Sequence, residues 1–186
     1  MIFLCAVVIG IALGYVLRGR LSHLAFLRLR GMWLVLSALA VQLVIFPLLG
    51  PKPILPYGTT ILHAASYGLV LLWLVLNLRV RPLFVMGAGA LLNALVVSAN
   101  GGYMPASLSA LTQTGANVAA AAVALGDTYG NIVGMTASTR LNFLGDWIPL
   151  PHWLPFATVM SVGDALIMVG LVWLLAKGMT MRGQDT

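Results

Sequence analysis

The chain has 186 residues, of which 61% are hydrophobic and only 8% are charged. Because a soluble domain carries about 25% charged residues, this composition argues against a soluble protein and predicts an integral membrane protein, with one transmembrane domain over residues 1–186. The formal net charge of +6 does not indicate nucleic-acid binding, since most basic residues lie in short loops beside apolar segments. A single cysteine, Cys5, excludes an internal disulfide.

Five apolar stretches approach the length of about 20 residues that crosses the hydrocarbon layer. In chain order they are about 1–17, 32–49, 59–78, 83–98 and 156–176. The first stretch has no positively charged residue before it, so we expect a retained helix and not a cleaved signal peptide. The sequence therefore predicts an all-α polytopic helix bundle with about five transmembrane helices, multi-pass in the cell membrane.

The basic residues are unevenly divided between the two sides of this bundle. Eight lie on one side, and two, Lys52 and Arg140, lie on the other. Cytoplasmic loops carry the excess of Lys and Arg, so the N-terminus is predicted outside and the C-terminus inside. The eight residues predicted to be cytoplasmic are Arg18, Arg20, Arg28, Arg30, Arg79, Arg81, Lys177 and Arg182. The first inner loop, residues 18–31, alternates arginines with leucines and favours a short helix on the inner surface.

The long segment 99–155 is predicted on the outer side. It contains an alanine-rich run, 116–125, that favours a helix too short to cross the bilayer. Whether residues 106–135 re-enter the membrane or lie on its surface stays open. Asn100-Gly101-Gly102 permits positive φ angles and close backbone approach. This loop indicates either a helix C-cap with a tight turn or a backbone loop over a polar site.

Few strongly polar residues lie inside the predicted spans. Counted from the outer helix ends at about 1.5 Å per residue, Gln42 is roughly 10 Å deep, His63 roughly 6 Å, Asn93 roughly 9 Å and Asp164 roughly 12 Å. A carboxylate inside the bilayer costs at least ~2.5–3.5 kcal/mol, which makes Asp164 the strongest functional candidate. Buried polar groups need partners, so we expect the four to meet in one cluster. The alternative is a set of hydrogen bonds that only hold the helices together.

A second carboxylate, Asp146, stands eighteen residues before Asp164, and three intervening prolines bend the chain. This bend brings Asp146 towards the outer end of the last helix. Two neighbouring carboxylates raise each other's proton affinity, so that one holds a proton while the other activates water. Arg140 is expected either to pair with a carboxylate or to bind a lipid phosphate.

The last span carries a family resemblance. Phe156-Ala157-Thr158 precedes Ser161-Val162-Gly163-Asp164, which is followed by Ile167 and Gly170. This series resembles the final helix of lipoprotein signal peptidase, an aspartic peptidase that cuts prolipoproteins within the membrane. Asp146 stands at the distance of that family's other catalytic aspartate. The resemblance implies that Asp146 and Asp164 form a catalytic pair.

Two shorter motifs bear on the same question. Gly130-Asn131-Ile132-Val133 and Asn100-Gly101-Gly102 resemble the peptidase family's Gly-Asn-x-x-Asp-Arg and Asn-x-Gly motifs. Ser161 stands where that family has Asn, and Gly134-Met135 stands where it has Asp-Arg. The run Asn-Gly-Gly-Tyr-Met-Pro with a late Gly-Asp helix also resembles an uncharacterised bacterial membrane family. That second resemblance implies a membrane location and no activity.

Three functions stay open from the sequence. They are an aspartate-dependent membrane hydrolase acting on a lipid or lipoprotein, a lipid or small-molecule binding or carrier protein, and a subunit of a homo-oligomer or larger membrane complex. No cofactor, metal or nucleic acid is expected, because the three histidines fall on separate segments and no redox or nucleotide motif is present. The predicted catalytic residues are Asp146 and Asp164, and the predicted substrate-binding residues are Asn100, Gly101, Gly102, Arg140, His63 and Asn93.

Overall fold

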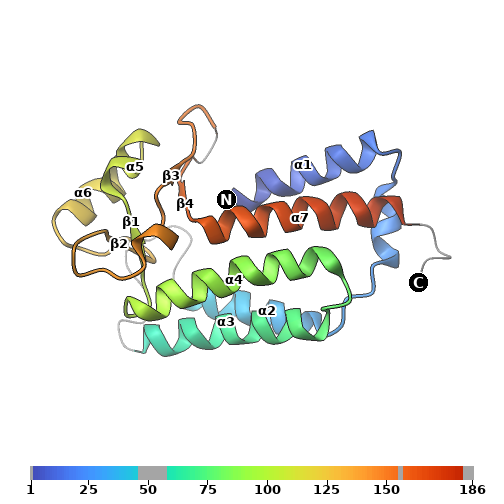
Figure 1. Cartoon of the computed structure of the whole chain (residues 1–186), viewed down its shortest axis with the longest axis horizontal. Helices are drawn as coiled ribbons and strands as arrows, with labels where there is room; N and C mark the ends of the chain where they lie inside the picture. The colour runs from blue at the N-terminus through green and yellow to red at the C-terminus, as the bar shows by residue number, and fades with distance from the viewer. Residues whose placement is uncertain (1, 46–57, 155–156, 182–186) are drawn as a thin grey trace.

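A computed structural model describes residues 2–45, 58–154 and 157–181 (Figure 1). Several of the residues on which the sequence predictions rest lie outside these ranges: Lys52, Arg182, the end of the second predicted span at 46–49, and Phe156 near the start of the last span. Within the described residues the chain is mostly helical.

Five apolar helices in the described part of the chain form a bundle: α1 (Ile2–Val16), α2 (Met32–Ile45), α3 (Thr59–Leu76), α4 (Arg81–Ala99) and α7 (Val162–Thr180). The first four lie within a few residues of predicted spans. Helices α4 and α7, each of 19 residues, are long and apolar enough to cross a membrane, whereas the other three apolar helices are shorter. Helix α7 packs against α1 and α4, and α3 packs against α2 and α4 (Figure 1).

Glycines bring α4 and α7 close together. A Cβ on Gly163 would overlap the side-chain amide of Asn93 and lie 2.7 Å from the carbonyl oxygen of Gly89. Further along α7, a Cβ on Gly170 would lie 2.9 Å from the carbonyl oxygen of Pro82. Small residues at such contacts let the backbones of membrane helices approach each other.

Helix α7 begins later than the predicted span. Strand β4 (Val159–Met160) precedes it and pairs in antiparallel fashion with β3 (Ile148–Pro149). Ser161 then caps the helix: its Oγ accepts a hydrogen bond from the backbone N–H of Asp164 at 2.9 Å, and Asp164 Oδ2 accepts one from the backbone N–H of Ser161 at 3.1 Å. The predicted helix start at 156 is therefore wrong.

The revised helix start changes the position of Asp164. It is the third residue of α7, so it lies only about 3–5 Å along the helix axis from the helix start and not roughly 12 Å. A carboxylate in the first turn also faces the positive end of the helix dipole, which stabilises its charge. Asp164 is a helix-terminal carboxylate and not a mid-helix one.

The 18–31 loop contains the short helix that its sequence favours, in the form of a 3₁₀ helix, η1 (Leu21–Phe26). It packs against the end of α7. His23 Nδ1 donates to the carbonyl oxygen of Met179 at 2.9 Å, and the Arg20 N–H donates to the same oxygen at 2.8 Å. These bonds fix the 18–31 loop to the end of α7.

The segment 99–155 corrects the all-α prediction. Strand β1 (Met104–Ala106) pairs in parallel with β2 (Ile132–Gly134), and these strands accompany helices α5 (Leu108–Gln113) and α6 (Asn117–Ala124) and a 3₁₀ turn, η2 (Asn142–Leu144). Helix α6 is the predicted helix at 116–125. Figure 1 shows α5 and α6 beyond one end of the bundle. Strands of two or three residues are too short to show an alternating pattern in sequence, so they went unpredicted.

Candidate functional site

A cavity of about 460 Å³ lies between the helices of the bundle. Gln42, His63, Asn93 and Asp164 all line it, although they come from four different helices. The sequence prediction that these four polar residues meet in one cluster is confirmed. The other lining residues are Phe3, Val35, Ala38, Leu39, Ser66, Tyr67, Val70, Ala90, Asn131 and Ile167.

The cavity is polar towards one end of the bundle and apolar further in. On α2, α3, α4 and α7 alike, a polar lining residue stands nearer the segment 99–155 than an apolar neighbour does. The polar and apolar pairs are Gln42 and Leu39, Tyr67 and Val70, Asn93 and Ala90, and Asp164 and Ile167. This gradient gives the cavity an amphipathic wall.

Asn93 joins α4 to the start of α7. Its Nδ2 donates to Asp164 Oδ1 at 2.8 Å, while its Oδ1 accepts a hydrogen bond from Ser161 Oγ at 2.9 Å. Asn93 and Ser161 are only 4% and 0% exposed. Buried polar groups are tolerated when they are hydrogen-bonded, and here each oxygen of the Asp164 carboxylate has a donor. We call Asn93, Ser161 and Asp164 the α4–α7 polar cluster.

His63 connects the cavity wall to the Asn-Gly-Gly loop. Its Nδ1 lies 2.8 Å from the carbonyl oxygen of Gly102, and because a carbonyl only accepts, Nδ1 carries the proton. The ring also stacks on Tyr67 with 5.1 Å between centroids. Thr60 Oγ1 donates to the carbonyl oxygen of Gly101 at 2.6 Å. Side chains of α3 therefore hold this loop beside the cavity.

The loop requires both of its glycines to adopt unusual backbone angles. Gly101 has φ of 68° and Gly102 has φ of 94°, the region that favours glycine. A Cβ on Gly102 would lie 2.9 Å from the Thr60 Cα. The sequence prediction of positive φ and close backbone approach is confirmed here.

Asn100 and Arg140 do not line the cavity. Asn100 Nδ2 donates to the carbonyl oxygens of Val96 at 2.7 Å and Arg140 at 2.8 Å, and its Oδ1 accepts from the Arg140 N–H at 2.8 Å. The side-chain amide of Asn100 thus holds the backbone of the segment 99–155 at Arg140. The Arg140 side chain is exposed, and within the described residues it forms no ion pair with Asp127 or Asp146.

Asp146 is buried beside strand β1, with 8% of its surface exposed. Its N–H donates to the Pro105 carbonyl oxygen, and its carbonyl oxygen accepts from the Ser107 N–H, both at 2.8 Å. The carboxyl oxygen Oδ1 has no hydrogen-bond partner. Burial raises the pKa of Asp146 well above its usual value, and the charge of Asp164 raises it further. The protonated form of Asp146 is therefore favoured.

The two aspartates are close enough to interact electrostatically, yet their roles in the structure differ. Asp164 lines the cavity with both carboxylate oxygens bonded, whereas Asp146 does not line it. Within the described part of the chain, no hydrogen bond joins the two carboxyl groups. The arrangement places two carboxyl groups at the same end of the bundle, and the pKa of the buried one, Asp146, is raised.

A family model matches residues 26–176, which is most of the chain. It describes a family of unknown function, DUF5317. The chain belongs to this family. No curated protein and no solved structure matches the chain, and a likeness to lipoprotein signal peptidase is not shown. The DUF5317 match contains every lining residue of the cavity except Phe3, which belongs to α1.

Some residues of the site in this DUF5317 member went unnoticed in the sequence. Ser66 and Tyr67 stand three and four positions after His63, a spacing that places side chains on one helix face. Gln42 Nε2 donates to Ser66 Oγ at 2.7 Å. Ser161-x-x-Asp164 is also a capping-box spacing, which marks a helix start. This spacing indicates a helix start at Ser161, whereas the apolar run before Ser161 favours an earlier one.

Replacing Asp146 by Asn is expected to remove a pH dependence of stability. The folded-state pKa of Asp146 is raised, so its contribution to the free energy of unfolding is greatest below the unfolded pKa of about 3.9 and falls as pH rises towards the folded pKa. Thermal unfolding in detergent across this range should show the fall in the wild-type protein and not in Asp146→Asn. Asp127→Asn, which alters an exposed carboxylate, is the control. Identical pH profiles for wild type and Asp146→Asn would contradict the assignment.

Proposed function

We propose that this protein is a multi-pass cell-membrane protein with five spans, its N-terminus outside and its C-terminus inside, and that it binds an amphipathic ligand in the cavity. Large apolar side chains on the outside of the bundle support the membrane location. Leu36 is 62% exposed, Ile61 74%, Phe84 67% and Val169 60%. Extended apolar surface of this kind is unusual on a soluble monomer and is satisfied by lipid.

The observation that carries the binding function is the amphipathic cavity wall. Its volume of about 460 Å³ suits a small ligand or part of a lipid, since ligand sites measure about 300–1,000 Å³. Val35, Leu39, Val70 and Ile167 provide an apolar wall for hydrocarbon. The polar end would hold a head group by hydrogen bonds.

The charges of the cavity restrict the head group. Asp164 is its one carboxylate among the described lining residues, and no Lys or Arg is present among them. An anionic head group would be repelled by Asp164 and would find no cation to offset this. A hydroxylated or amine-bearing head group fits, because Gln42, His63, Asn93 and Asp164 supply hydrogen-bond acceptors and donors.

A tryptophan at position 70 tests the binding function. Val70→Trp fills the cavity, whereas Leu72→Trp places the same side chain on the same helix at a position that is 49% exposed. We expect Val70→Trp to lose roughly tenfold or more in affinity for lipids that co-purify with the wild-type protein, a change of about 1.4 kcal/mol. Mass spectrometry of lipids retained after detergent exchange measures this. Equal retention by both folded variants would rule out the cavity as the binding site.

A second candidate function is the aspartate-dependent hydrolysis of a lipid or lipoprotein. The observation in its favour is Asp146, whose pKa is raised by burial and by Asp164 and whose buried Oδ1 has no hydrogen-bond partner. A carboxyl group with a raised pKa beside a second carboxyl group resembles an aspartic dyad. Binding ranks above hydrolysis because Asp146 does not line the cavity.

The hydrolase function predicts turnover that depends on both carboxyl groups. The wild-type protein in liposomes would be incubated with a diacylglyceryl-modified peptide, and products would be followed by mass spectrometry. We expect Asp146→Asn and Asp164→Asn to abolish product formation while Asp127→Asn retains it. If both dyad variants still form the product that the wild type forms, a catalytic role of the two carboxyl groups is contradicted. If the wild type forms no product, the hydrolase function is contradicted and ligand binding is the remaining proposal.

A further inference from the structure

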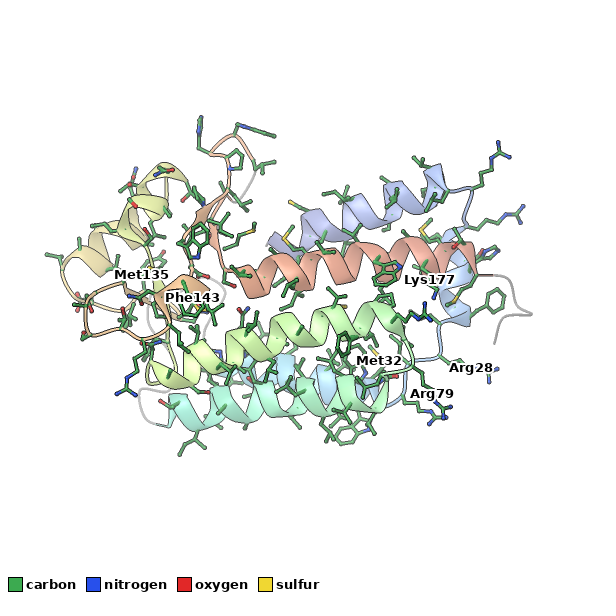
Figure 2. All side chains as sticks on the ribbon, viewed as in Figure 1. Arg28, Met32, Arg79, Met135, Phe143 and Lys177 are labelled. Carbon is green, nitrogen blue, oxygen red and sulfur yellow. The ribbon has the colours of Figure 1, made fainter. Side chains whose placement is uncertain are left out.

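A basic pocket of about 450 Å³ lies at the end of the bundle opposite the segment 99–155. Arg28 and Arg30 from the first inner loop and Arg79 from the α3–α4 turn all line it. Figure 2 shows Arg28 and Arg79 towards the same end as Lys177, away from Met135 and Phe143 of the outer segment. Among the described residues, no carboxylate lines this pocket.

A buried asparagine holds the two basic segments together. Asn77 is 4% exposed, and its Oδ1 accepts from the Arg30 N–H at 2.8 Å. Its Nδ2 donates to the carbonyl oxygens of Arg30 at 2.9 Å and Trp73 at 2.8 Å. The side-chain amide thus fixes the loop that carries Arg28 and Arg30 against the turn that carries Arg79. Three arginines thus line one pocket, and among the described residues no carboxylate lines it to offset their charge.

The basic pocket adjoins an apolar groove between α3 and α4. The groove has a volume of about 270 Å³ and shares Val75 and Leu78 with the pocket. Gly87 and Ala88 of α4 form part of its wall, and because glycine has no side chain and alanine only a methyl group, they leave the groove open. A cationic pocket that continues into an apolar groove matches a molecule with an anionic head and a hydrocarbon tail.

We propose that the basic pocket and the adjoining groove bind one anionic phospholipid of the inner leaflet. The phosphate lies among the guanidinium groups of Arg28, Arg30 and Arg79, which suit phosphate because each presents several N–H donors in a plane. One acyl chain lies along α3 and α4. The site rests on the membrane placement proposed above but not on ligand binding in the outer cavity.

General membrane topology does not account for this arrangement. An excess of Arg and Lys on the cytoplasmic side follows from the positive-inside rule, and anionic lipids attract such residues without a defined site. That rule explains how many arginines lie at this end. It does not explain why a buried asparagine holds the backbone of Arg30 beside the α3–α4 turn, or why three arginines line one pocket that continues into a groove.

The test compares two triple variants with the same loss of charge. Arg28→Gln, Arg30→Gln and Arg79→Gln together alter the pocket, whereas Arg18→Gln, Arg20→Gln and Arg81→Gln alter the same end of the bundle outside it. Native mass spectrometry of the purified chain titrated with phosphatidylglycerol or phosphatidylcholine measures binding. We expect the pocket variant to bind phosphatidylglycerol roughly tenfold or more weakly and the control to stay within about twofold of the wild type. Equal weakening in both triples, or none in either, would overturn the proposal.

A groove variant keeps the proposal testable if the triple variant fails to fold. A Cβ on Gly87 makes only ordinary contact, 3.5 Å from Leu74 Cδ1, so Gly87→Leu is accommodated while filling the groove. We expect it to weaken phosphatidylglycerol binding without changing the arginines, and unchanged binding would contradict a seated acyl chain. Glycerol phosphate should compete poorly; competition as strong as that of the lipid would show a free-phosphate site instead. Val70→Trp should leave this binding unchanged, which separates the proposal from the outer cavity.

Discussion

The contact between α4 and α7 through Asn93, Ser161 and Asp164 is the constraint on which the rest of the site depends. Gly163 leaves space for the Asn93 side chain, and Asn93 then bonds both the cap residue and the carboxylate of α7. This α4–α7 polar cluster determines where α7 begins. It therefore fixes Asp164 at the cavity wall and the β3–β4 pair just before the helix.

The α4–α7 polar cluster also explains how an apolar bundle contains a carboxylate. A lone ionised group in the middle of a membrane helix would be costly. Asp164 avoids much of this cost because it occupies the first turn, faces the helix dipole and accepts hydrogen bonds from Asn93 and from the Ser161 N–H. These hydrogen bonds give Asp164 a structural role, and because Asp164 also lines the cavity, it remains a candidate for ligand contact.

The positions of α1 to α4 and the meeting of the four polar residues could be predicted, because hydropathy and helical rise are properties of local sequence. The start of α7 could not be placed by hydropathy, since Val159 and Met160 are apolar whether they form helix or pair with β3. The burial of Asp146 depends on backbone bonds to Pro105 and Ser107, about forty residues earlier in the chain. Such long-range pairing leaves no signal in composition or periodicity.

The two ends of the bundle differ in charge, and this difference determines which head group is proposed for each site. Among the described lining residues, the cavity beside the segment 99–155 has a carboxylate and no cation, whereas the pocket at the opposite end has three arginines and no carboxylate. Each polar region continues into an apolar one along the helices. The two proposed ligands therefore differ in head-group charge, an anionic one at the arginine-lined pocket and a hydroxylated or amine-bearing one at the cavity beside Asp164.

The most direct test of the account is a double-mutant cycle between Asn93 and Asp164. The free energies of unfolding of the wild type, Asn93→Ala, Asp164→Ala and the double variant would be measured in one detergent. If the Asn93–Asp164 hydrogen bond links α4 to α7, we expect a favourable coupling energy of about 1.5–3 kcal/mol, the range for a hydrogen bond to a charged group. A coupling energy within about 0.5 kcal/mol of zero, the limit for independent sites, would contradict the claim that the α4–α7 polar cluster links the two helices.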